Sequence, residues 1–162
     1  MTHGLLPVRT ARPVDPQPVV ESFLAALAEP DLAGAGALLD EAVVYTNVGL
    51  PTIRGPRRVV RFLSLLDRPG CRFEVYLHAV AADGSVVLTE RTDVIELGRV
   101  RLQFWVTGRF DVQAGQITLW RDSFDYLDCT RAFVRALVGV VVPPLRPRPP
   151  ASVSTAPGRH AR

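Results

Sequence analysis

The segment RVRLQFWVTGRFDV, residues 99–112, alternates between apolar and polar side chains more regularly than any other part of the chain. Successive side chains of a β-strand point to opposite faces, so this pattern predicts a strand with one buried and one exposed face. The apolar face comprises Val100, Leu102, Phe104, Val106, Phe110 and Val112. The polar face comprises Arg99, Arg101, Gln103, Thr107, Arg109 and Asp111.

Four more strands are expected around this one, at residues 41–48, 72–80, 86–97 and 116–126. The last four strands along the chain are separated only by short turn signals, so they predict an antiparallel meander. Val20, Phe23, Leu24 and Leu27 fall at helical spacing and predict a first helix that Pro30 ends, and further helices are expected over residues 32–39, 56–67 and 128–140. This order predicts an α+β fold in which a curved mixed or antiparallel sheet wraps around helices and encloses a deep apolar pocket.

The length of 162 residues favours a single domain. We expect this domain at residues 17–142, between a disordered arm at 1–16 and a disordered Pro/Arg-rich tail at 143–162. No apolar run approaches the ~20 residues of a membrane span, and no secretory signal is apparent, so a cytoplasmic location is expected. The two cysteines, Cys71 and Cys129, lack the spacing of a zinc or redox site.

The net charge of +3 comes from the ends of the chain. Residues 17–145 contain 13 arginines and 15 acidic residues, a balance of 13 − 15 = −2. A nucleic-acid-binding domain needs clustered positive charge on its folded part. The sequence therefore argues against a nucleic-acid partner.

Polar residues two positions apart interrupt the apolar faces of three predicted strands. Residues at i and i+2 share a face, so these side chains are expected to point into the pocket. The residues are Tyr45 and Asn47 on the first strand, Arg91 and Asp93 on the third, and Asp122 with Trp120, Phe124 and Tyr126 on the last. Burying a carboxylate between aromatic rings is costly unless it is paired, and Arg91 is the obvious partner for both acids.

Two carboxyl groups that share one arginine need not both be ionised. If one of them keeps a proton, the pair supplies a general acid and a general base at the same pH. Opening of a strained ether by water needs such a pair and needs no nucleophilic side chain. A phenol and an amide, here Tyr45 and Asn47, could hold the attacking water. The simpler interpretation of the Arg-x-Asp pair is a structural ion pair.

The combination of Tyr45-x-Asn47, LTERTD (residues 88–93) and ITLWRDSFD (residues 117–125) resembles the limonene-1,2-epoxide hydrolase family, including mycobacterial members that open larger lipid epoxides. The resemblance covers most of residues 17–142. It implies an NTF2-like cone, a homodimer, and hydrolysis of a hydrophobic epoxide to a vicinal diol in one step. It also implies that Asp122 is the base, Asp93 the acid and Arg91 the bridge between them, and that Tyr45 and Asn47 position the water.

Five apolar residues are expected to line the substrate pocket: Trp120, Phe124, Ile95, Phe104 and Val106. A proton-transfer enzyme of the ketosteroid isomerase or polyketide cyclase type is the main alternative, although it has no use for an arginine between two acids. A non-catalytic lipid-binding or steroid-binding protein is the other. No metal-ligand cluster or dinucleotide fingerprint appears, so neither a metal nor a cofactor is expected. His78 alone among the histidines lies in the predicted domain, which disfavours Ser-His or Cys-His catalysis.

Overall fold

The computed structural model describes residues 15–142 together with residues 144 and 148. Most of the arm and tail expected at 1–16 and 143–162 therefore lies outside the described residues. Along the chain, the structure contains α1 (Pro16–Ala28), α2 (Leu32–Ala37), β1 (Leu39–Asn47), β2 (Ile53–Arg54), α3 (Pro56–Leu63), β3 (Cys71–Asp83), β4 (Val86–Leu97), β5 (Val100–Gln113), β6 (Gln116–Ser123) and α4 (Tyr126–Val141). The α+β class is confirmed.

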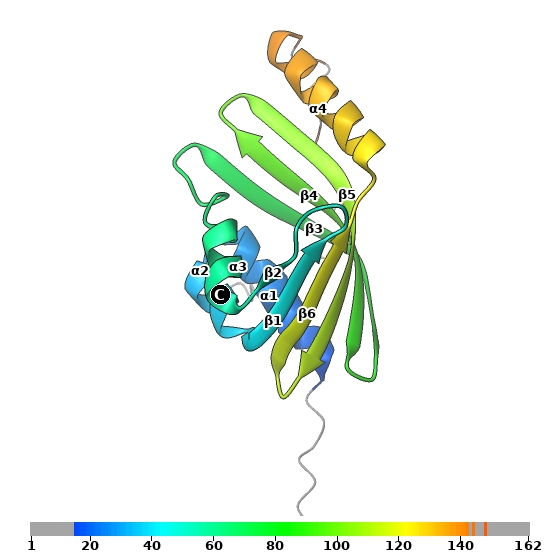
Figure 1. Cartoon of the computed structure of the whole chain (residues 1–162). Helices are drawn as coiled ribbons and strands as arrows, with labels where there is room; N and C mark the ends of the chain where they lie inside the picture. Colours follow the sequence, from blue (N-terminus) through cyan, green and yellow to red (C-terminus); the bar gives the residue numbers. More distant parts are fainter. Residues whose placement is uncertain (1–14, 143, 145–147, 149–162) are drawn as a thin grey trace, which may run out of the picture.

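The strands form one curved sheet in the order β2-β1-β6-β5-β4-β3 (Figure 1). Strands β3 to β6 are antiparallel neighbours, as the short turns between them predict. Strand β1 joins β6 in parallel, and β2 pairs with the outer side of β1. The sequence pattern did not reveal β2, because two residues are too few for a period to be seen.

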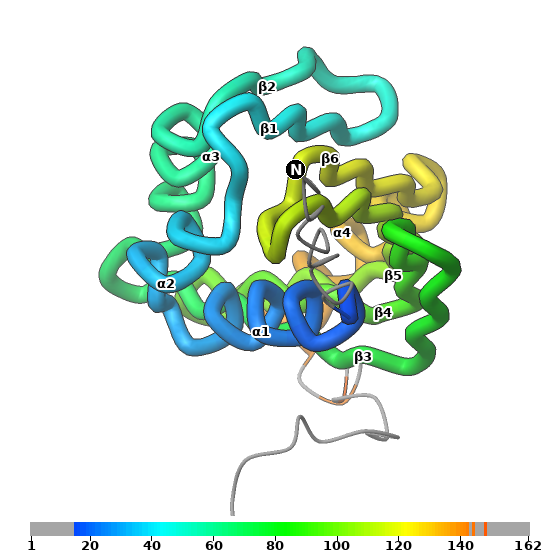
Figure 2. Tube along the Cα trace, turned by 90° about the horizontal axis from the view of Figure 1, so that it is seen from below, coloured from blue at the N-terminus to red at the C-terminus, as the bar shows by residue number. Residues whose placement is uncertain are grey.

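Helix α1 packs against the concave side of the sheet (Figure 2). Asp15 caps its first turn by accepting a hydrogen bond from the backbone N–H of Gln17, so the helix begins one residue before the predicted domain boundary. Besides Pro16, its buried side chains are those that the helical spacing predicts: Val20, Phe23, Leu24 and Leu27. The ring of Phe23 meets the inward face of the sheet at Trp120, with 4.9 Å between ring centroids.

Helix α4 packs along β5 on the convex side of the sheet and buries Ala132, Ala136 and Gly139. Its start corrects the sequence prediction, which placed Tyr126 on the last strand. Strand β6 ends at Ser123, and Asp125 caps α4 by accepting hydrogen bonds from the backbone N–H groups of Leu127 and Asp128. Among the described residues, no helix is long and apolar enough to cross a membrane.

Candidate active site

A cavity of about 320 Å³ opens between α1, α3 and the concave face of the sheet. All ten residues predicted for the site line it: Tyr45, Asn47, Arg91, Asp93, Ile95, Phe104, Val106, Trp120, Asp122 and Phe124. The remaining lining residues are all apolar: Leu24, Leu27, Phe62, Leu63, Leu65, Leu66, Phe73 and Val75. A few convergent polar groups in an otherwise apolar cavity are typical of a small-molecule site.

The register of three strands brings the two carboxylates together. Strand β5 lies between β4, which carries Asp93, and β6, which carries Asp122. Arg91 is opposite Val106 on β5, and Asp122 is opposite Gly108 two residues further along the same strand. The Arg91 side chain therefore crosses the inward face of β5 and connects β4 with β6.

The guanidinium of Arg91 binds both acids. Its Nε donates to Oδ1 of Asp93 at 2.9 Å, and its Nη2 donates to Oδ2 of Asp122 at 2.6 Å. All three charged residues are withdrawn from water: the exposed fraction is 1% for Arg91, 6% for Asp93 and 5% for Asp122. The Trp120 indole Nε1 donates to the second Asp122 oxygen at 2.8 Å.

Two residues that were not predicted from the sequence, Thr89 and Gly108, accommodate this arginine. The Thr89 hydroxyl accepts a hydrogen bond from Arg91 Nη1 at 3.3 Å. A Cβ at Gly108 would lie 2.5 Å from Nη1 and 2.6 Å from the Thr89 hydroxyl oxygen, so no larger residue fits there without displacing the guanidinium. Glycine in the middle of a strand weakens it and often marks a close approach of other groups. Gly108, the one position on the apolar face of residues 99–112 without an apolar side chain, was the available signal.

Gly108→Ala is expected to lower kcat by about 100-fold, because a displacement of about 1 Å at a catalytic group can have an effect of that size. The added methyl should also destabilise the fold by about 1–3 kcal/mol through overpacking. Steady-state kinetics and thermal unfolding measure both effects. Thr107→Ala, on the exposed face of the same strand, is the control. Full activity of Gly108→Ala would show that the Arg91 position is not critical.

Tyr45 and Asn47 lie on β1 beside Asp122. Asn47 is in register with Asp122 and Tyr45 with Trp120, on the parallel neighbour strand β6. The Asn47 amide donates a hydrogen bond to the Tyr45 hydroxyl oxygen, which leaves the phenolic proton free to be donated elsewhere. Burial, followed by the nearby Asp122 charge, raises the pKa of Tyr45, so the side chain is a neutral phenol.

Burial gives Asp93 a higher pKa than an ordinary aspartate has. Loss of water around the carboxyl group raises the pKa of Asp93 from 3.8 to about 6, and the negative charge of Asp122 adds to the rise, while Arg91 opposes it. For Arg91, burial works against the charged form, but the two neighbouring carboxylates outweigh it and raise its pKa. The site therefore combines a permanent cation with a carboxyl group that holds its proton to unusually high pH.

His78 lies outside this cavity, on the convex face. Its Nε2 is 2.8 Å from the Thr92 hydroxyl oxygen, and its ring stacks on Trp105 with 4.7 Å between centroids. Within residues 15–142, 144 and 148, no group of three or more His, Cys, Asp or Glu side chains is arranged to hold a metal ion. Apart from the Trp120 indole, which donates to Asp122, the polar side chains that line the cavity are the five predicted ones.

Comparison with known proteins identifies the family of this chain. The family described as limonene-1,2-epoxide hydrolase catalytic domain matches residues 14–135. Epoxide hydrolase EphG of Mycobacterium tuberculosis is 48% identical over 128 residues, which span 78% of this chain and 85% of that protein. A solved M. tuberculosis LEH-like epoxide hydrolase superposes with a TM-score of 0.77 at 45% identity, and covers 82% of this chain and 94% of its own.

A solved NTF2-like protein from Cytophaga hutchinsonii shares the fold at 18% identity, with a TM-score of 0.59 over 73% of this chain and 95% of its own. This likeness confirms the NTF2-like cone. The family itself is shown by two other matches. The family model covers most of the domain, and the mycobacterial epoxide hydrolase EphG shares nearly half of the aligned residues. The chain belongs to the limonene-1,2-epoxide hydrolase family of enzymes.

Proposed function

We propose that the protein hydrolyses a hydrophobic epoxide to a vicinal diol in one step, with Asp122 as general base and Asp93 as general acid. One observation carries the proposal: a single buried guanidinium binds two carboxyl groups from different strands at 2.9 and 2.6 Å, inside an apolar cavity. A buried arrangement of this kind lets one carboxyl stay protonated while the other is ionised.

In the proposed reaction, Asp122 takes a proton from water as the water oxygen attacks one ring carbon. The bond between that carbon and the epoxide oxygen breaks, and Asp93 gives its proton to the departing oxygen. The product is a diol, and no enzyme atom bonds to carbon. One proton then returns from Asp122 to Asp93 to restore the starting state. General acid and general base catalysis each contribute typically 10²–10⁴-fold.

The attacking water would be held by three groups. Each Asp122 oxygen has two lone pairs, so the carboxylate can accept a hydrogen bond from water while it binds Arg91 and Trp120. Tyr45 still has its phenolic proton to donate, and Asn47 has a second amide proton and its carbonyl oxygen. Three contacts fix the direction of attack.

The apolar lining supports a hydrophobic substrate. Among hydrophobic epoxides we propose a fatty-acyl or sterol epoxide over a small terpene, as the resemblance to family members that open larger lipid epoxides implies. The test is incubation with styrene oxide, limonene oxide, an epoxystearate and a sterol epoxide in H₂¹⁸O, followed by mass analysis of the products. Labelled diol is expected. Isomerised product would favour the isomerase alternative, and tight binding without turnover would favour a lipid-binding protein.

The pKa of about 6 for Asp93 predicts the pH dependence. The acid must be protonated to act, and its raised pKa keeps the proton only below about pH 6. In the free enzyme kcat/KM should therefore fall about tenfold per pH unit above that value, because kcat/KM reports the pKa of the free enzyme. Initial rates between pH 5 and 9 measure this. A value of kcat/KM that stays constant or rises from pH 6 to 8 would exclude Asp93 as the acid.

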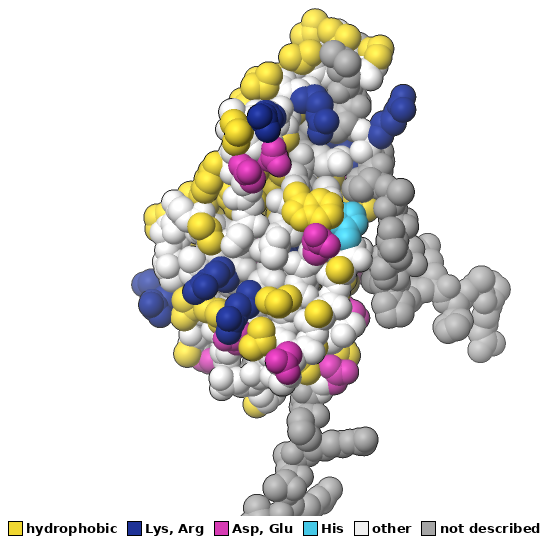
Figure 3. All heavy atoms as spheres, turned by 90° about the vertical axis from the view of Figure 1, so that its right-hand side faces the viewer, with side chains coloured by type: hydrophobic (Ala, Val, Ile, Leu, Met, Phe, Trp, Pro, Cys, Tyr) yellow, Lys and Arg dark blue, Asp and Glu magenta, His cyan; other side chains and the backbone are white. Residues whose placement is uncertain are grey.

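We also propose that the protein is a cytoplasmic homodimer. Apolar side chains gather over α4, at the top of the face in Figure 3, and many of them are exposed: Phe133, Val134, Leu137, Val138 and Val141. A contiguous apolar patch on a folded protein commonly marks a contact with another protein. Both cysteines are unbonded, which suits a reducing compartment. Sedimentation should give twice the chain mass of 17.7 kDa, and a monomer would contradict the dimer.

A further inference from the structure

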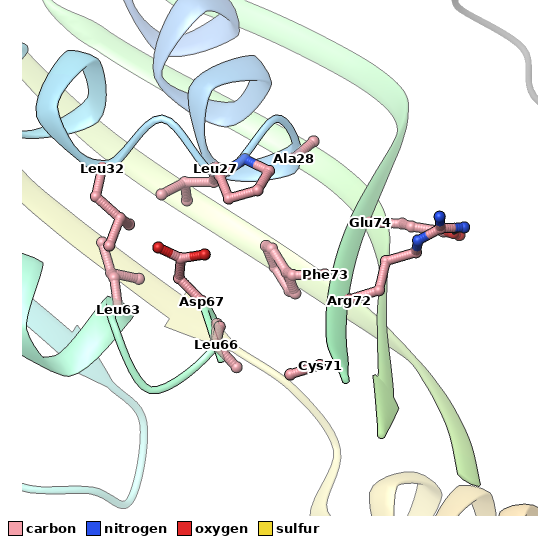
Figure 4. Close-up of a pocket in the computed structure, with 11 residues that line it drawn as sticks. Leu27, Ala28, Leu32, Leu63, Leu66, Asp67, Cys71, Arg72, Phe73 and Glu74 are labelled. Carbon is pink, nitrogen blue, oxygen red and sulfur yellow. The ribbon is translucent and has the colours of Figure 1, made fainter. Parts of the chain in front are cut away.

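A second cavity, larger than the first, adjoins the candidate active site. Its volume is about 510 Å³, and we call it the outer cavity. It lies between the ends of α1 and α3 and the start of the edge strand β3 (Figure 4). Its lining combines apolar residues with three charged ones, Asp67, Arg72 and Glu74.

The two cavities have a common wall. Four side chains line both of them, and all four are apolar: Leu27, Leu63, Leu66 and Phe73. Nothing charged therefore lies in this wall between the carboxylates and the outer cavity. A hydrocarbon group attached to an epoxide at the carboxylates could pack along these four apolar side chains.

Three charged residues line the outer cavity: the Asp67 carboxylate lies among the leucines in Figure 4, whereas Arg72 and Glu74 lie apart from them. Arg72 is 71% exposed and approaches Glu74 to 3.8 Å, and Figure 4 shows the two side by side, away from the leucines. By contrast, Leu66 and Phe73 remain half-buried although they line the cavities. When an apolar ligand covers apolar surface of this kind, the removal of that surface from water stabilises the complex.

We propose that the outer cavity binds the distal hydrocarbon chain of a long aliphatic epoxide whose ring is held between Asp93 and Asp122. The chain runs along the wall of Leu27, Leu63, Leu66 and Phe73, and a polar end group reaches solvent near Arg72. This inference rests on the proposed function and specifies its substrate class as long-chain aliphatic epoxides.

The test fills the outer cavity without touching the inner one. Ala28 and Cys71 line only the outer cavity and are small, so Ala28→Phe and Cys71→Phe reduce its volume. Rates are measured on 1,2-epoxyalkanes of six to fourteen carbons. For the fourteen-carbon epoxide, kcat/KM should fall at least about tenfold, since each buried methylene contributes to binding. For the six-carbon epoxide it should change less than about twofold.

Ala81→Phe, which adds the same ring at an exposed position of β3 outside both cavities, is the matched control. Equal losses for short and long epoxides would overturn the inference while leaving the proposed function intact. Unchanged rates for all chain lengths would overturn it as well. Absence of turnover for every epoxide in the unmodified protein would count against the proposed function instead.

A second measurement is independent of turnover. Cys71 is half-buried in the outer cavity, so its reaction with a maleimide, in a Cys129→Ala background, reports whether the cavity is filled. Saturating 1,2-tetradecanediol should slow the labelling several-fold, whereas 1,2-hexanediol should leave it unchanged. Equal labelling rates with the two diols would contradict occupation of the outer cavity by the chain.

Discussion

Asp122→Asn is expected to lower kcat/KM by about 10²–10⁴-fold, the typical contribution of a positioned general base. Asparagine has nearly the shape of aspartate but cannot accept a proton from water. Its carbonyl oxygen can replace only one of the two acceptors that now bind Arg91 Nη2 and Trp120 Nε1. We therefore expect the fold to survive with a loss of about 1–3 kcal/mol for the unsatisfied donor.

The measurement is diol formation together with thermal unfolding of the same preparation. Asp83→Asn, at the exposed end of β3, makes the same chemical change away from the cavity and should leave both quantities unchanged. A folded Asp122→Asn variant with full activity would remove Asp122 from the role of base.

Arg91→Lys is expected to lower kcat/KM by at least about 100-fold. The planar guanidinium holds Asp93 through Nε and Asp122 through Nη2 at the same time, across the width of strand β5. An ammonium is a single point charge and cannot match this geometry, so at least one carboxyl group loses its position. A misplacement of about 1 Å is enough for an effect of this size.

The chain supplies a matched control for this variant. Arg109 and Asp111 repeat the same spacing on β5, and Arg109 Nε donates to Asp111 Oδ1 at 2.9 Å, but the pair faces solvent. Arg109→Lys should therefore leave both the thermal stability and the activity nearly unchanged. If Arg91→Lys were as mild as Arg109→Lys, the arginine would be a structural ion-pair partner without a part in catalysis.

The sequence predicted the meander and the faces of its strands because alternation records which side of a strand is buried. It placed Arg91 and Asp93 on the inward face of β4, and Asp122 and Trp120 on that of β6, where the structure has them. The same rule was wrong at Tyr126, because the polar N-cap at Asp125 ends the extended segment and starts α4. Alternation describes strands and contains no information on where a cap interrupts them.

Contacts between strands could not be predicted from the sequence. Alternation alone does not show that the Arg91 side chain crosses β5 at Gly108, because this depends on the register of three strands. The role of Thr89 as a partner of Arg91 could not be predicted either, because a buried threonine in a strand has no distinctive sequence pattern. The outer cavity depends on where α1 and α3 end relative to β3, and element ends are the least reliable part of a sequence interpretation.

In the proposed mechanism, water attacks the epoxide directly while two buried carboxyl groups move protons. A single turnover in H₂¹⁸O, with enzyme in excess over epoxide, tests it most directly. We predict that the first diol formed contains one ¹⁸O atom and that Asp93 and Asp122 gain none. An unlabelled first diol, with ¹⁸O appearing in an aspartate carboxyl group, would reveal a covalent ester intermediate and exclude direct attack by water.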